Sequence, residues 1–191
     1  MKKKILYVAA LLICLSIITG GTLAYFTAED TARNVITTGG VAVSVVQQQL
    51  VDGALQPCPD QPIPVMPDTT VSRVVSIQST KQSAWVRLQY EITVYDASGE
   101  QKALTAEELA QIILITPDDT NWTLVDGWWY YNNAIGFGEI AEPLFDSIAF
   151  SGPNMGNDYQ GCSMVLQITA QAVQQANNGT TVLEAAGWPE A

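Results

Sequence analysis

Apolar and polar residues alternate along several stretches of the chain, and the longest runs over residues 84–95. Every second position is apolar, whereas the positions between them include Arg87, Gln89, Glu91 and Thr93. A period of two predicts a β-strand with one face in a core and the other towards water. Further strands are predicted at residues 40–49, 71–78, 122–125, 128–131, 139–144, 148–150 and 163–173.

One substantial helix is predicted, starting at Thr105. Thr105 and Glu108 have the spacing of a capping box, in which each side chain bonds the other residue's backbone amide. Leu109, Ile112 and Ile113 follow at helical spacing and form one apolar face. Many short strands with few helices indicate an all-β fold, an antiparallel sandwich with one or two short helices.

The remaining segments divide the chain into four parts. We expect a domain over residues 41–176, with the proline-rich stretch 57–67 as a surface loop. Residues 177–191 are polar and are predicted to be a poorly ordered C-terminal tail. Residues 1–24 and 25–40 precede the domain, and each has a separate interpretation.

Residues 1–24 have the layout of a secretory signal peptide, which we expect to form a helix. Three lysines are followed by an apolar run over residues 5–18 and then by small residues ending in Ala24. The apolar run is shorter than the roughly 20 residues of a membrane-spanning helix, although a retained anchor is the alternative. Cleavage between Ala24 and Tyr25 would leave a secreted protein. Before cleavage, the chain would contact a membrane only through the signal.

Charge and composition exclude several classes of function. The chain has 19 acidic and 8 basic residues. Loss of three lysines with the signal would give the remaining chain a net charge of 5 − 19 = −14. Such an acidic protein is unsuited to nucleic acid, whose phosphates need clustered lysine and arginine. The sequence has no histidine, which removes the Ser-His-Asp, Cys-His and HExxH sites. We therefore predict no catalytic residue and no enzyme activity.

Two minor sites are open to alternative interpretations. Cys58 and Cys162 are the cysteines that remain after signal removal, and we expect either a disulfide between them or free thiols. Asp118 and Asp119 lie in an oxygen-rich loop that could bind calcium, although such loops are more often solvated turns. We otherwise predict no cofactor.

Several stretches match, in order along the chain, the motifs of one family of exported proteins. The first is Gly20–Thr27, followed by Asn34-Val35 and Gly39-Gly40-Val41. Ser83–Leu88 resembles the family's small-aromatic-Val-Arg strand, and residues 168–177 resemble its closing strand. Within Ser83–Leu88 the matching residues include Trp85 and Arg87, and further matches are Asp126, Gly127, Trp128, Glu139, Leu144 and Phe145. Together these stretches resemble the TasA/camelysin family.

The resemblance implies a jelly-roll sandwich that is exported through a SipW-type signal peptidase and builds extracellular biofilm-matrix fibres. The partner would be a second copy of the chain, joined head to tail, and a minor fibre-anchoring protein is a further expected partner. Residues 25–40 would act as a donor strand that enters the neighbouring subunit, with Tyr25 and Phe26 as anchors and Val35 and Ile36 next to them. An incoming strand satisfies the open backbone groups of a sheet edge.

Three other interpretations are open. The segment 25–36 could be the molecule's own first strand. The tryptophans, with Tyr130 and Tyr131, could instead form a platform for carbohydrate on a monomeric cell-wall-binding module, although alternation predicts that two of the four rings of residues 128–131 point inward. Camelysin-like members are also named metalloproteases. A metalloprotease needs protein ligands for its catalytic metal, and a chain without histidine supplies them poorly.

Overall fold

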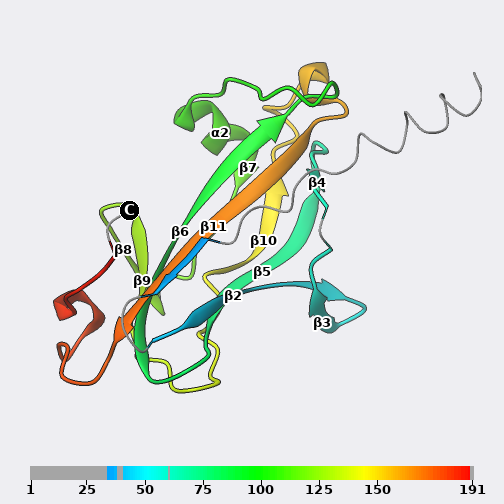
Figure 1. The fold of residues 1–191 in the computed structure, drawn as a ribbon. Helices are drawn as coiled ribbons and strands as arrows, with labels where there is room; N and C mark the ends of the chain where they lie inside the picture. Colours follow the sequence, from blue (N-terminus) through cyan, green and yellow to red (C-terminus); the bar gives the residue numbers. More distant parts are fainter. Residues whose placement is uncertain (1–33, 38–40, 60, 190–191) are drawn as a thin grey trace, which may run out of the picture. The chain divides into compact units, whose positions relative to one another are not determined.

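Two β-sheets face each other in the computed structural model, which describes residues 41–59 and 61–189 and the backbone of residues 34–37 (Figure 1). These residues all fall within one compact unit, Thr31–Ala191. In the part of the chain described, no helix is long and apolar enough to cross a membrane.

The first sheet is built around two twelve-residue strands that lie side by side, drawn in orange and green in Figure 1. They pair antiparallel along their whole length, from Ser163 opposite Tyr95 to Gln174 opposite Ala84. The order of the sheet is β1 (Asn34–Thr37), β11 (Ser163–Gln174), β6 (Ala84–Tyr95), β9 (Trp128–Tyr131) and β8 (Trp122–Val125), and β4 (Ile63–Pro64) also pairs with β11.

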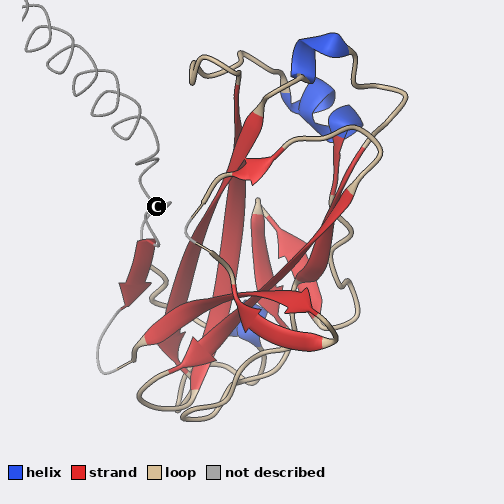
Figure 2. Ribbon diagram, turned by 90° about the vertical axis from the view of Figure 1, so that its right-hand side faces the viewer, coloured by secondary structure: helices blue, strands red, loops and turns tan. Residues whose placement is uncertain are grey.

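The second sheet packs against the first, and Figure 2 shows the two layers from the side. Its order is β3 (Ala54–Pro57), β2 (Val43–Val51), β5 (Thr70–Ser79), β10 (Phe145–Phe150) and β7 (Ile113–Leu114). All of its pairings are antiparallel. The predicted all-β sandwich is therefore confirmed.

The core lies between the sheets and follows the predicted alternation. On β6, Ala84, Val86 and Leu88 are fully buried, while Gln89 and Glu91 lie on the opposite face. The same period continues on β11, where the even-numbered residues from Met164 to Ala172 are buried in the main core.

The helix α2 (Ala106–Ile112) begins at the predicted cap. Thr105 Oγ1 accepts a hydrogen bond from the Glu108 amide, and the Thr105 amide donates to Glu108 Oε2, at 3.2 and 2.8 Å. Ile112 is buried, but Ile113 already belongs to β7. Two further short helices, η1 (Asn157–Tyr159) and η2 (Val182–Glu184), are of the 3-10 type.

The strand predicted at residues 139–144 is wrong. This segment runs beside β5, and the amide of Ala141 donates a hydrogen bond to the carbonyl of Ile77. The pair Ile140–Gln78 is an isolated β-bridge and not part of a regular strand. Pro143 has no amide hydrogen, which interrupts a regular ladder. The regular strand of this region starts at Phe145 instead.

The expectation of a poorly ordered tail is also wrong for residues 177–189. Val182 and Ala185 of this segment form a second small core with Trp85 and Val173 on the outer face of the first sheet. Asn178 fixes the fold of the segment, because its side-chain amide bonds backbone groups on both sides of it. Because the segment is mostly polar, its sequence did not indicate that these few apolar residues pack on the sheet.

Candidate functional site

The strand β1 lies on the edge of β11 that faces away from β6. It runs parallel to β11, with Asn34 opposite Thr169 and Val35, Ile36 and Thr37 opposite the next three residues. Val35 and Ile36, two of the predicted donor residues, thus belong to a strand of the chain's own sheet in this state. Ala24, Tyr25 and Phe26 lie outside the described residues.

The same edge of β11 is shared with β4. Ile63 and Pro64 pair with Met164 and Ser163 at the other end of the strand. Between β4 and β1, no described strand pairs with residues 165–168 of β11 on this side. Among the described strands, β6 is therefore the one partner of these four residues at the middle of the edge.

Arg87 lies at the centre of a cluster on the outer face of the first sheet. Its Nε and Nη2 atoms donate to Gln171 Oε1, on the neighbouring strand, at 2.9 and 2.6 Å. Its Nη1 atom donates to the hydroxyl of Tyr130, on the other neighbouring strand, at 2.6 Å. The register explains these contacts, because Gln171 and Tyr130 are the two cross-strand partners of Arg87.

The guanidinium group of Arg87 is also covered by aromatic rings. Its central carbon lies 4.3 Å from the ring centroid of Trp128 and 4.7 Å from that of Trp188. Trp188 meets Tyr130 edge to face, at 5.5 Å between centroids, and the carbonyl of Pro189 accepts a bond from Arg87. Arg87 thereby adds to the apolar contacts that hold the C-terminal segment against the sheet.

One member of the cluster has an unused hydrogen-bonding group. Gln171 is fully buried, and its Nε2 atom has no hydrogen-bond partner among the residues that the structure describes. Because its carbonyl oxygen accepts twice from Arg87, the amide orientation is set by the arginine. Sequence reasoning missed Gln171, although the antiparallel register of two long strands places it opposite Arg87, and it considered Trp188 only as part of a carbohydrate platform.

The other residues of the resembling motifs have structural positions. Trp85 is covered by the C-terminal segment and donates from its ring nitrogen to Asn178 O at 2.8 Å. Asp126 and Gly127 form the turn between β8 and β9, both with positive φ, at 49° and 81°. Glu139 Oε2 accepts from the amide of Gly136 at 2.7 Å. Leu144 and Phe145 are buried in the main core.

The four-ring stretch of β9 divides between the two faces as alternation predicts. Tyr131 packs into the main core against Trp122, and Trp129 packs against the same core. Trp128 and Tyr130 lie on the outer face with Arg87. These rings pack within the chain and do not form an open row on its surface.

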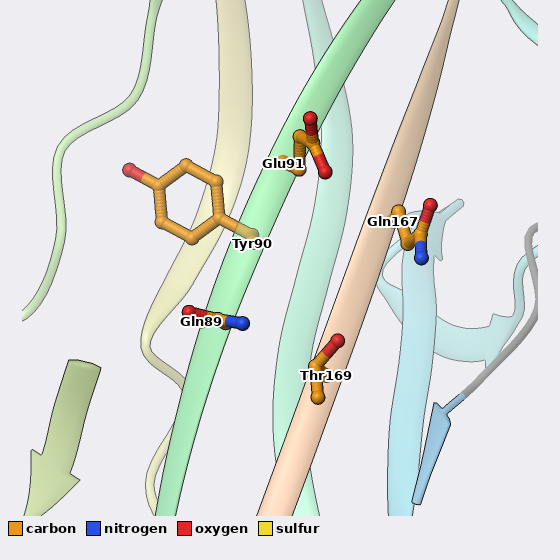
Figure 3. A pocket seen from close by; sticks show the side chains of 5 residues that line it. All are labelled: Gln89, Tyr90, Glu91, Gln167 and Thr169. Carbon is orange, nitrogen blue, oxygen red and sulfur yellow. The ribbon is translucent and has the colours of Figure 1, made fainter. Parts of the chain in front are cut away.

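A shallow pocket of about 210 Å³ lies on the exposed part of the first sheet and is shown in Figure 3. Its lining residues come from β6 and β11 and are Gln89, Tyr90, Glu91, Gln167 and Thr169. Burial raises the pKa of the Tyr90 hydroxyl, whose ring packs on Phe145. The pocket is smaller than the roughly 300–1,000 Å³ of typical ligand sites.

The Asp118 carboxylate is used within its own loop. Its Oδ1 atom accepts from the amides of Thr120 and Asn121, and its Oδ2 atom accepts from the Asn121 side chain at 2.7 Å. The Asn121 side chain and these amides lower the pKa of Asp118. Asp119 is exposed beside it. Within the described residues, no group of three His, Cys, Asp or Glu side chains is placed to hold a metal.

Cys58 and Cys162 are free thiols in this structure, which is the second of the two alternatives that the sequence left open. Cys162 is buried, and its Sγ atom lies 3.6 Å from Asp158 O. Cys58 is half-buried and interacts with Arg73 of β5. Burial raises the pKa of both thiols, and Arg73 opposes that effect only in part at Cys58.

Comparison with known proteins supports the resemblance at the N-terminal end of the chain. Residues 1–60 match the model of a family described as camelysin metallo-endopeptidase. The match covers the segment before β1, β1 itself, β2 and β3. No curated protein and no solved structure matches the chain.

Proposed function

We propose that this chain is a secreted structural protein that forms extracellular biofilm-matrix fibres, joined by donation of the N-terminal strand of one subunit to the next. It acts outside the cell, in the matrix or at the cell surface, after cleavage between Ala24 and Tyr25 by a SipW-type signal peptidase. Its main partner is a second copy of itself, with a minor anchoring protein at the fibre end. No catalytic step is part of this function.

The observation that carries the proposal is the position of β1. It is a four-residue strand at the edge of a sheet, attached through its pairing with β11. A terminal edge strand can leave its sheet without breaking the core sandwich, and an open edge accepts a strand from another chain. A head-to-tail contact of this kind does not close on itself and therefore grows into a filament.

The family match gives independent support. It covers residues 1–60, which include the proposed signal, the proposed donor segment and β1. The packing of Trp85 under the C-terminal segment and of Trp128 against Arg87 favours a structural role over a carbohydrate platform, because covered rings cannot stack on a sugar.

The test compares the chain that starts at Tyr25 with one that lacks residues 25–30. Electron microscopy and sedimentation measure filament formation at equal concentration. We expect filaments from the first and few or none from the second, because Tyr25 and Phe26 anchor the donor. Equal filament formation by both chains would show that this end does not carry the contact.

A second candidate function is supported by the family's description as a metallo-endopeptidase. A casein-digestion assay of the purified protein, with and without a chelator, tests it. We expect no chelator-sensitive cleavage.

Calcium binding at Asp118 and Asp119 is tested on the same purified protein by calorimetric titration with calcium. A saturable binding signal that is lost in Asp118→Asn would establish the site.

A further inference from the structure

We infer that Asn178 is a modification site, at which the side-chain amide is converted spontaneously to a carboxylate when the C-terminal segment 177–189 leaves the first sheet. The reaction needs only water, and its product prevents the segment from docking again. The site thus acts as an irreversible switch that uncovers the outer face of this sheet. This inference goes beyond the proposed function and does not depend on fibre assembly.

The sequence places the two reacting groups next to each other. Asn178 is followed by Gly179, and this is the one Asn–Gly pair in the chain. The backbone nitrogen of Gly179 can attack the side-chain carbonyl carbon of Asn178, because glycine has no side chain to hinder the approach. A carbon–nitrogen bond forms, the side-chain nitrogen of Asn178 leaves as ammonia with the proton that the Gly179 amide loses, and an imide ring results. Water then opens the ring to give aspartate or its isomer, in which the backbone runs through the former side chain.

The fold requires both residues of this pair. Gly179 has a φ of +79°, and a Cβ atom there would lie 3.0 Å from backbone and side-chain atoms of Glu184. The Asn178 Nδ2 atom donates to the carbonyls of Gln174 and Ala186, both at 3.0 Å, and its Oδ1 atom accepts from the Ala186 amide at 2.9 Å. Asparagine is the shortest side chain that supplies two donors and an acceptor. The docked segment therefore depends on a chemically labile pair.

The docked segment also protects the amide. Both N–H groups and the oxygen of the planar Asn178 carboxamide are hydrogen-bonded. The attack makes the carbonyl carbon tetrahedral, so these bonds stabilise the unreacted state more than the transition state. The Asn178 backbone is held as well, since its carbonyl accepts from Trp85 Nε1 at 2.8 Å and its amide donates to Gln175 O at 3.2 Å. The rate of reaction therefore follows the fraction of molecules in which the segment is open.

The product cannot restore the docked state. A carboxylate accepts hydrogen bonds but donates none, so the carbonyls of Gln174 and Ala186 would each face a negative oxygen instead of an N–H group. The isomer also lengthens the backbone at a position where the chain is closely packed. Release of the segment uncovers Trp85 and Val173, which are buried in the small core below it.

The first test opens the segment without changing Asn178. Val182→Asp puts a charge into the small core, whereas Leu183→Asp adds the same charge at an exposed neighbouring residue. Both chains start at Tyr25 and are incubated in mildly alkaline buffer beside the unsubstituted chain, which is kept folded in one sample and unfolded in urea in another. Mass spectrometry of peptides measures the conversion of Asn178, and circular dichroism checks that the sandwich stays folded.

The rates of conversion decide whether docking controls the reaction. We expect Val182→Asp to react at least about tenfold faster than the folded unsubstituted chain, and close to the rate of the unfolded one. Leu183→Asp should keep the slow rate. Equal rates in the two variants would overturn the inference, as would a folded unsubstituted chain that reacts as fast as the unfolded chain.

A second arm tests the product and does not depend on a core variant. Asn178→Asp carries the aspartate that the reaction forms, and Asn177→Asp adds the same charge at the exposed preceding residue. Hydrogen exchange, followed by mass spectrometry, is compared between residues 178–189 and the two long strands β6 and β11.

We expect exchange over residues 178–189 to be at least about tenfold faster in Asn178→Asp than in Asn177→Asp or the unsubstituted chain, with β6 and β11 unchanged. Equal protection of the segment in the two variants would refute the switch even if Asn178 reacts in the first test. Faster exchange in β6 and β11 as well would also refute it, because the segment would then not open independently of the sandwich.

Discussion

Replacing Arg87 by lysine tests whether the cluster on the outer face holds the C-terminal segment against the sheet. The guanidinium group makes three bonds of 2.9 Å or less, two to Gln171 and one to Tyr130, and lies between the rings of Trp128 and Trp188. A lysine ammonium keeps the charge but loses the flat, forked group that makes these contacts.

The expected loss follows from these contacts. A hydrogen bond to a charged group contributes about 1.5–3 kcal/mol, and stacking of a cation on an aromatic ring contributes about 0.5–2 kcal/mol. Lysine would keep one or two of the bonds and part of the cation–ring attraction, so we expect Arg87→Lys to cost about 2 kcal/mol. For a protein of this size, that lowers the melting temperature by about 4–8 °C.

Calorimetry and urea unfolding measure the change, and Arg73→Lys is the matched control. Arg73 also lies on a strand, but its side chain makes fewer contacts, a long hydrogen bond of 3.4 Å to Gln47 and an interaction with Cys58. We expect the control to cost less than about 0.5 kcal/mol. Equal losses in the two variants would refute the argument that the Arg87 cluster is a main stabilising contact of the outer face.

Three further predictions concern single groups. Thr105→Ala should destabilise the protein by about 1 kcal/mol in urea unfolding, because it removes the helix cap, and a change below 0.2 kcal/mol would contradict this. A thiol reagent at pH 8 should modify Cys58 before Cys162, since only Cys58 has substantial exposure; labelling at equal rates would show that Cys162 is not in the core. Hydrogen bonds lower the folded-state pKa of Asp118 and Glu184, so their contribution to stability is complete above the ordinary values of 3.8 and 4.5 and is lost as the pH falls through the lower folded-state values. Melting curves should therefore shift to lower temperature as the pH falls below 4.5, and a higher melting temperature in acid would contradict the signs of these shifts.

Local patterns predicted the long elements of the fold well. The alternation over residues 84–95 identified β6 and its buried face, and the pair Thr105 and Glu108 located the start of α2. Both signals depend on neighbouring residues, whose spacing fixes which side chains share a face or meet a backbone amide. The ranges predicted for β8 and β9 also match the structure.

Long-range features could not be obtained in this way. The pairing of β1 with β11 joins residues about 135 positions apart, and no local pattern selects that partner or its parallel direction. The packing of residues 177–189 depends on a few apolar side chains, among them Val182 and Trp188, within a polar segment. The free state of Cys58 and Cys162 depends on where the folded chain places each thiol, which their even number does not specify.

A cryo-electron microscopy reconstruction of the filaments, at a resolution that traces the backbone, tests the account most directly. The account predicts that the N-terminal strand of each subunit, which starts at Tyr25, lies in a sheet of the neighbouring subunit. A map in which that segment stays within its own subunit, with the subunits joined at another surface, would contradict it.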